Sequence, residues 1–124
     1  MLDQRSILVV DDEEALRTVL SSELVSEGYQ VESASDGDEA ITIVQNKPFD
    51  LVLLDIILPK KNGFETLEAI RQSPIFSSAR VIILSNLGQE ADLSRGKSLS
   101  VLDYWVKAEN PIDVLMTKIR NTLS

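Results

Sequence analysis

Three acidic side chains follow two apolar segments of the chain, each at the point where the segment ends. Asp55 closes the apolar run 51–54, and Asp11 and Asp12 follow the apolar run 7–10. Short runs of this kind are typical of strands that are buried on both faces of a parallel sheet. The carboxyl ends of such strands meet at one edge of the sheet, where open α/β sheets bind their ligands. We therefore expect the three carboxylates to converge at that edge.

A cluster of carboxylates points to a particular chemistry. Two ionised carboxylates about 4 Å apart repel each other by roughly 4 kcal/mol at an effective dielectric constant of about 20. A divalent cation relieves this repulsion, and Mg²⁺ prefers carboxylate oxygens while it keeps waters that a phosphate oxygen can replace. Asp55 can then attack phosphorus as a nucleophile and form an aspartyl phosphate. Ser85 and Lys107 follow two later predicted strands and offer a hydroxyl and an ammonium group to the phosphoryl oxygens.

Strand-like and helix-like patterns alternate five times along the chain. Apolar runs predict strands at residues 6–10, 51–54 and 81–84, and two more mixed segments predict short strands at 29–33 and 102–106. Helical spacing predicts helices at 13–27, at about 40–47, after Gly63, at 89–98 and from Pro111 onward. The first of these helices is expected to end at Gly28 and to carry Leu16, Val19, Leu20 and Leu24 on one face.

This alternation with short connections predicts a doubly wound α/β fold. We expect a five-stranded parallel sheet of order 2-1-3-4-5, with right-handed crossovers and five helices on its two faces, as in flavodoxin-like proteins. Residues 1–124 would form one domain with a core from about 5 to 123. In this order strands one and three are neighbours, which brings the acids at their ends together.

The composition excludes several classes of function. A formal net charge of -8 argues against a nucleic-acid surface, which needs clustered Lys and Arg. The chain has no cysteine and no histidine, which excludes disulfides, zinc sites of the usual kind and Ser-His hydrolase triads. No run approaches the roughly 18 apolar residues of a membrane span, so we expect no membrane contact and a cytoplasmic location.

Five short motifs lie in sequence near the ends of the predicted strands. They lie at residues 8–13, 53–55, 59–63, 84–85 and 103–107. With these motifs nearly the whole chain resembles the receiver domain of two-component response regulators, of the stand-alone kind that chemotaxis regulators represent. The resemblance implies a phospho-accepting signalling domain rather than an enzyme, with at most its own phosphotransfer and a slow self-dephosphorylation.

The resemblance also implies a metal site and a phosphate donor. Asp12 and Asp55 would bind Mg²⁺ directly together with the backbone carbonyl of Ile57, and Asp11 would act through water. Asp55 would take its phosphoryl group from a histidine kinase or a histidine phosphotransfer protein.

A switch is implied as well. Lys107 would pair with the phosphoryl group, Ser85 would move toward it, and Tyr104 would turn inward as Ser85 moves. The changed surface would be the face formed by residues 89–98, strand 102–106 and the last helix, where an unknown downstream protein binds. No output domain follows Ser124, so we expect either a stand-alone receiver or a piece of a longer regulator.

Four residues depart from the family's usual pattern. Ala108 follows Lys107 where receivers usually have a proline, commonly cis, so the Lys107–Ala108 bond is expected to be trans and the loop reshaped. Asn86 stands where a small residue is usual, and could crowd the phosphoryl pocket or donate a hydrogen bond to it. Ile57 and Leu87 are apolar at positions that influence the attacking water, which predicts slow self-dephosphorylation.

Other interpretations stay open at this point. Asp11 or Asp12 could cap the first helix. The protein could be a degenerate receiver that only binds partners, or a phosphatase of the haloacid dehalogenase type, which would need a second acid where this chain has Ile57. A flavodoxin-like cofactor carrier would need a phosphate-binding loop after the first strand, where the acids 11–14 would repel phosphate.

Overall fold

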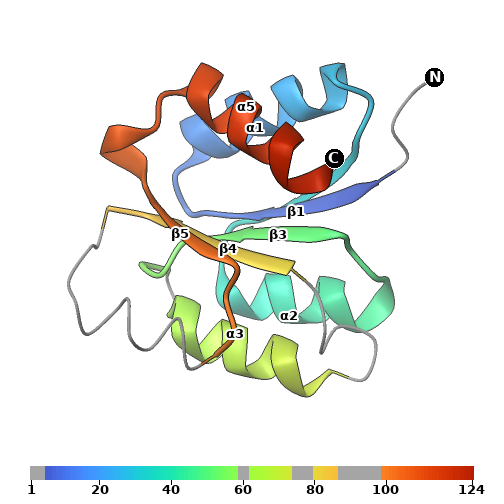
Figure 1. Ribbon diagram of the computed structural model, residues 1–124. Coiled ribbons are helices and arrows are strands. Elements are labelled where there is room, and N and C mark those ends of the chain that lie inside the picture. The colour runs from blue at the N-terminus through green and yellow to red at the C-terminus, as the bar shows by residue number, and fades with distance from the viewer. Residues whose placement is uncertain (1–4, 59–61, 74–79, 87–98) are drawn as a thin grey trace.

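A twisted parallel sheet forms the centre of the protein, with strands in the order β2-β1-β3-β4-β5 (Figure 1). The computed structural model describes residues 5–58, 62–73, 80–86 and 99–124. The strands span Ser6–Val10 (β1), Gln30–Ala34 (β2), Leu51–Leu54 (β3), Arg80–Ser85 (β4) and Asp103–Val106 (β5). All four neighbouring pairs are parallel, so the carboxyl ends of the strands lie at the same edge.

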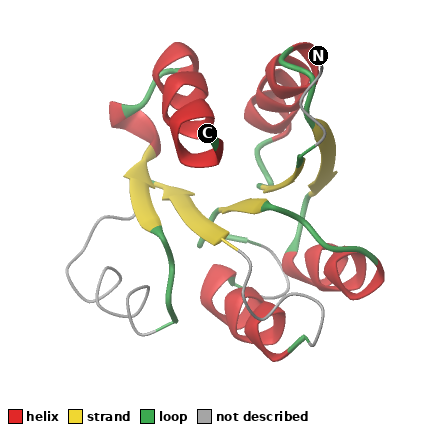
Figure 2. Cartoon of the chain, turned by 45° about the vertical axis from the view of Figure 1, so that its right-hand side comes forward, coloured by secondary structure: helices red, strands yellow, loops and turns green. Residues whose placement is uncertain are grey.

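Helices cover both faces of this sheet. The helices span Glu14–Ser26 (α1), Gly37–Asn46 (α2), Gly63–Gln72 (α3) and Ile112–Leu123 (α5), and a short 3₁₀ turn (η1) spans Lys107–Glu109. Helices α1 and α5 pack on one face, and α2 and α3 on the other, as Figures 1 and 2 show. None of the described helices is long and apolar enough to cross a membrane.

The two central strands are buried on both sides because their side chains alternate between two cores. Ile7 and Val9 of β1 pack in the cluster under α1 and α5. Leu8 and Val10 belong to the cluster under α2 and α3. Strand β3 alternates in the same way. Burial on both faces explains why these strands appear in the sequence as unbroken apolar runs.

Local signals in the sequence fix the helix ends. Asp36 accepts a hydrogen bond from the Glu39 N–H at 2.8 Å and caps α2. Asn62 and Glu65 form a reciprocal capping box at the start of α3. Gly28 follows α1 with φ of 97°, a left-handed conformation that glycine adopts without a steric penalty.

The predicted fold class and strand order are confirmed, with small differences at the element ends. Strand β5 begins at Asp103 rather than at residue 102, and Pro111 is the N-cap of α5 rather than its first helical residue. Val19 of the predicted apolar face of α1 is 48% exposed, because it lines a groove between α1 and the segment before α5. The predicted helix at 89–98 lies outside the described residues.

Candidate functional site

Asp55 lies directly after β3 and is buried, with 4% of its surface exposed. Its N–H donates to the Val10 carbonyl at 3.0 Å, so the sheet pattern continues past Leu54 and fixes its backbone. One carboxylate oxygen, Oδ1, accepts a hydrogen bond from the Ile57 N–H at 3.0 Å. This bond orients the carboxylate and leaves Oδ2 toward the rest of the site.

The three predicted acids do meet at the carboxyl edge of the sheet. Asp11, Asp12 and Asp55 each offer an oxygen, and these oxygens lie within 4.8 Å of one another. The pairing of β1 with β3 sets Val10 opposite Leu54, so the residues that follow them are neighbours. Asp11 and Asp55 are buried and Asp12 is exposed. A cluster of carboxylate oxygens that is open on one side suits a hard divalent cation such as Mg²⁺.

Lys107 reaches into this cluster from the end of β5. Its Nζ atom lies 2.7 Å from Asp11 Oδ2, 2.7 Å from Asp55 Oδ2 and 3.7 Å from Glu13 Oε2. The Lys107–Ala108 peptide bond is trans, as expected for a bond without proline. Lys107 therefore contacts Asp55 even though the usual proline is missing.

Burial and the lysine act in opposite directions on the acids. Burial raises the pKa of Asp11, although the hydrogen bonds from Lys107 and from the Glu13 N–H oppose that rise. Burial alone would lower the pKa of Lys107, but its hydrogen bonds to Asp11 and Asp55 outweigh this and raise the pKa. The Lys107 ammonium contacts Asp11, Asp55 and Glu13, and Asp12 adds a fourth carboxylate, so the site keeps an excess of negative charge that a cation can neutralise.

The predicted switch residues lie on β4 and β5, the last two strands of the sheet order. Ser85 is the last residue of β4 and is fully buried. It pairs with Val106, the residue before Lys107. Tyr104 is half-buried and packs against the apolar cluster of Ile56, Phe64 and Ile83. Tyr104 thus lies on the side of β5 that faces the loop after Asp55.

The alternative role of Asp11 as a cap is partly observed. Asp11 Oδ1 accepts a hydrogen bond from the Glu13 N–H at 2.9 Å, while Glu13 itself is the N-cap of α1 and makes no side-chain cap. Asp11 therefore orders the start of α1 and contacts Lys107 with its other oxygen. The Ile57 side chain is 54% exposed, and Leu87 lies outside the described residues.

Two further residues support the site, although the sequence alone does not assign them a role. Gly63 begins α3 and donates its N–H to the Ile56 carbonyl at 2.7 Å, and a Cβ atom there would lie 2.3 Å from the Asp55 carbonyl oxygen. The pair Asn62-Gly63 before a helix was the available signal. Arg17 donates to the Asp11 carbonyl at 2.8 Å, and nothing in the sequence marks that contact.

Comparison with known proteins agrees with this geometry. The family model for the response regulator receiver domain matches residues 7–120. The chain is 38% identical over 122 residues to a probable transcriptional regulator ycf27 of Cyanophora paradoxa, covering 98% of this chain and 49% of that protein. It is 37% identical over 110 residues to the alkaline phosphatase synthesis regulator PhoP of Bacillus subtilis, covering 89% of this chain and 45% of that protein. The chain thus spans about half the length of the curated relatives it matches.

Solved structures show the same likeness along almost the whole chain. The chemotaxis protein CheY4 of Vibrio cholerae superimposes with a TM-score of 0.88 at 27% identity, covering 96% of this chain and 98% of that one. The receiver domain of HemR from Leptospira biflexa gives a TM-score of 0.89 at 27% identity, covering 98% and 95%. A doubly wound sheet with an acid cluster and a lysine at its carboxyl edge defines a phospho-accepting class of signalling domain. The chain belongs to the response regulator receiver domain family.

Proposed function

We propose that Asp55 is the residue that accepts the phosphoryl group and that the acid cluster holds Mg²⁺ during the transfer. The observation that carries this proposal is the environment of Asp55, a buried carboxylate that shares one cluster with Asp11 and Asp12 and contacts Lys107 at 2.7 Å. In the transfer an Asp55 oxygen forms a bond to phosphorus while the bond from phosphorus to the donor's leaving atom breaks. The leaving atom keeps the electron pair, and Asp55 has no proton to lose because it attacks in its ionised form.

The residues of the cluster would have different roles toward the ion. Asp12 and Asp55, with the Ile57 carbonyl, would bind the ion directly. Asp11 would act through water, as the family resemblance implies. Bound Mg²⁺ would supply positive charge for one phosphoryl oxygen. The Lys107 ammonium and the Ser85 hydroxyl would bind the other oxygens, and Lys107 would exchange its contact with Asp11 for one with the phosphoryl group.

The phosphate donor is proposed to be a histidine kinase or a histidine phosphotransfer protein. A groove of about 490 Å³ runs from Lys107 along α1, and its walls are largely apolar. Apolar side chains on both of its sides line it: Ala15, Leu16, Val19, Pro111, Ile112 and Leu115. An amphipathic helix that carries the phosphorylated histidine fits such a groove, with its histidine facing Asp55. The exposure of Val19 is consistent with this role.

We propose that a protein surface, rather than nucleic acid, reads the phosphorylated state of this domain. The relatives are named as transcriptional regulators, but this chain matches only about half of their length. A net charge of -8 is unsuited to contacts with phosphate backbones. Phosphorylation would shift a pre-existing equilibrium in which Ser85 and Tyr104 take two arrangements, and the β5 face would change with them.

We further propose that the domain is not an enzyme toward other substrates. A phosphatase of the haloacid dehalogenase type needs an acid two residues after its nucleophile, and this chain has the largely exposed side chain of Ile57 there. The contact of Lys107 with Asp55 also weakens the case for a degenerate receiver, because the missing proline was its main support.

The proposal is tested by incubating the protein with a small phosphate donor such as phosphoramidate, with and without Mg²⁺. Intact-mass measurement should show one added phosphoryl group only when Mg²⁺ is present. Asp55→Asn should remain unmodified, whereas Asp50→Asn, before β3, should be modified like the wild type. A wild-type protein that stays unmodified with Mg²⁺ present would overturn the proposal.

Magnesium is expected to stabilise the folded protein through Asp12. At a Mg²⁺ concentration ten times the Kd, binding adds about 1.4 kcal/mol to the free energy of unfolding. Asp12→Asn should leave the stability without Mg²⁺ within about 0.5 kcal/mol of wild type, because Asp12 is exposed, and should remove most of the gain. Urea unfolding followed by Trp105 fluorescence measures the free energy of unfolding with and without Mg²⁺. Glu14→Gln, an exposed acid of the same helix end, should keep the gain, and an undiminished gain in Asp12→Asn would contradict the assignment.

Self-dephosphorylation is expected to be slow, and Ile57→Asn is expected to accelerate it. The apolar Ile57 side chain is exposed beside Asp55 and cannot orient water. An amide there can hold the attacking water by one hydrogen bond, which corresponds to about a tenfold rate increase. The decay of the phosphorylated form after removal of the donor measures this rate. Ile57→Leu should decay like wild type, and equal decay of Ile57→Asn and wild type would refute the explanation.

A further inference from the structure

A hydrogen bond joins the two loops that follow β4 and β5. The Ala108 N–H donates to the side-chain Oδ1 of Asn86 at 3.0 Å. Asn86 is the residue directly after Ser85, and Ala108 is the residue directly after Lys107. The bond therefore connects the neighbours of two residues that would contact the phosphoryl group.

This bond depends on the identity of residue 108. Proline has no backbone N–H, so a proline at this position could not donate to Asn86. The bond also depends on the identity of residue 86, because alanine or glycine there would offer no side-chain acceptor. The bond thus needs both residues as they stand in this chain, an asparagine at 86 and a residue other than proline at 108.

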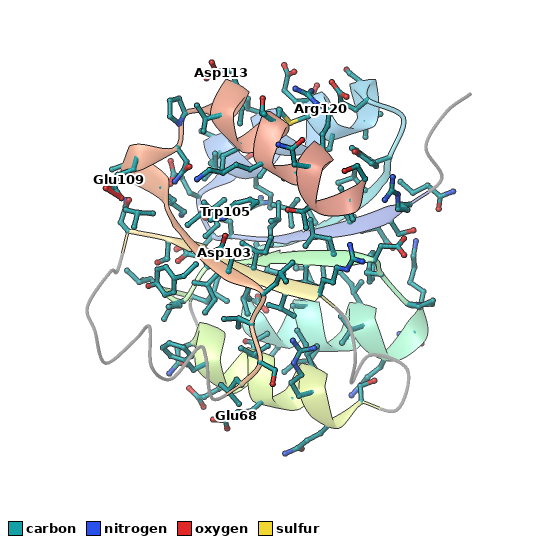
Figure 3. All side chains as sticks on the ribbon, viewed as in Figure 1. Glu68, Asp103, Trp105, Glu109, Asp113 and Arg120 are labelled. Carbon is teal, nitrogen blue, oxygen red and sulfur yellow. The ribbon has the colours of Figure 1, made fainter. Side chains whose placement is uncertain are left out.

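The turn that carries Lys107 is held from its other end as well. Lys107 begins η1, and its carbonyl accepts from the Asn110 N–H at 3.2 Å. The buried Asn110 side chain donates to the Val106 carbonyl at 2.7 Å and accepts from Lys118. Glu109, labelled at the outer side of this turn in Figure 3, is exposed. Asn110 thus holds the part of the turn that leads to α5, and Asn86 holds the part that faces β4.

We propose that Asn86 is a positioning residue for Lys107: its bond to the Ala108 N–H fixes the backbone after Lys107 and so keeps the ammonium group on Asp55. The bond restricts the turn that carries Lys107. Asn86 does not have to touch the phosphoryl group for this role. An effect of Asn86 on the rate of phosphorylation rests on the proposed function of Asp55. The effect of Asn86 on the position of Lys107 is a property of the unphosphorylated protein.

The kinetic test compares the initial rates of modification by phosphoramidate and Mg²⁺. Asn86→Ala should be about five- to tenfold slower than wild type, since small losses of alignment at a reacting centre have effects of this size or larger. Glu109→Ala is the matched control, because it changes the same turn without touching the bond, and it should keep the wild-type rate. An Asn86→Ala variant as fast as wild type would overturn the proposal.

A second pair of variants separates positioning from a general structural effect. In an Ala108→Pro background the donor is gone, so adding Asn86→Ala should slow the reaction no further. If Asn86→Ala lowers the rate equally in both backgrounds, the bond to Ala108 is not the cause, and the proposal fails.

Urea unfolding of the unphosphorylated protein tests the role of Asn86 independently of phosphorylation. Lys107→Met should lower the urea midpoint more in the wild-type background than in the Asn86→Ala background, because the lysine is well placed only in the former. Equal shifts in the two backgrounds would overturn the inference. If the wild type is never phosphorylated, the function proposed for Asp55 fails, and this unfolding cycle still decides whether Asn86 positions Lys107.

Discussion

Replacing Lys107 by methionine is expected to lower the free energy of unfolding by about 3 kcal/mol at pH 7, in the absence of Mg²⁺. The ammonium group of Lys107 contacts the buried carboxylates of Asp11 and Asp55, each at 2.7 Å. Removing one partner of a buried ion pair leaves the other charge uncompensated, which costs more than the pair itself contributes. Urea unfolding followed by Trp105 fluorescence measures this loss. Trp105 is buried on β5, where the Lys118 ammonium of α5 lies 5.4 Å from its ring, and it donates to Asp103 at 2.8 Å (Figure 3).

The free energy of unfolding that Lys107→Met loses should depend on pH. Burial raises the pKa of Asp11, and without Lys107 nothing in the site opposes this rise except the Glu13 N–H. A group whose pKa is higher in the folded state destabilises the fold as the pH rises through that pKa. The deficit of Lys107→Met should therefore be present at pH 7 and shrink as the pH falls toward about 4, the ordinary pKa of aspartate.

An exposed lysine provides the control for this experiment. Lys47 pairs with Glu32 at 2.8 Å, but both side chains are about 40% exposed. Exposed pairs of this kind contribute about 1 kcal/mol or less. Lys47→Met should therefore change the stability little at any pH. If Lys107→Met is as stable as wild type at pH 7, the lysine does not neutralise the buried acids.

Gly63→Ala is expected to destabilise the protein by about 3 kcal/mol and to slow phosphorylation. An added Cβ atom would lie 2.3 Å from the Asp55 carbonyl oxygen and 2.5 Å from the Ile56 Cα atom, so the backbone itself must move. The backbone that moves carries Asp55, the proposed phosphate acceptor. Elsewhere in a helix the same glycine-to-alanine change is stabilising by roughly 0.5–1 kcal/mol, so the sign of the effect is diagnostic.

Unfolding and phosphorylation should be measured on the same Gly63→Ala preparation. Gln72→Ala, at the exposed end of α3, is the matched control and should behave like wild type in both assays. A stable Gly63→Ala protein with a normal rate of phosphorylation would show that the loop after Asp55 does not need this close approach.

Much of the fold follows from patterns that are local in the sequence. The runs 7–10 and 51–54 are apolar at every position because both faces of β1 and β3 are covered, and the amino-acid sequence alone displays this pattern. Parallel strands with short crossovers then bring Asp11, Asp12 and Asp55 to one edge. The acid cluster was therefore predictable from strand ends alone.

Features that depend on contacts between distant segments were not predictable in the same way. The helical period of α1 marks Val19 as apolar, but only the neighbouring elements decide that it faces a groove rather than the core. The reach of Lys107 depends on the turn after β5, and that turn depends on Asn86 of another loop. Gly63 illustrates a third case, because a close approach of two backbones leaves only the glycine itself as a signal.

The claim that Asp55 takes up phosphorus is tested most directly by locating the modified atom. The protein is phosphorylated with phosphoramidate and Mg²⁺ and then reduced with borohydride, which converts an aspartyl phosphate to homoserine and releases phosphate. Peptide mass analysis should find homoserine at position 55 in the wild type, and none when Mg²⁺ is omitted or in Asp55→Asn. Homoserine at position 11 or 12, or its absence from a protein that carries phosphate, would contradict the account.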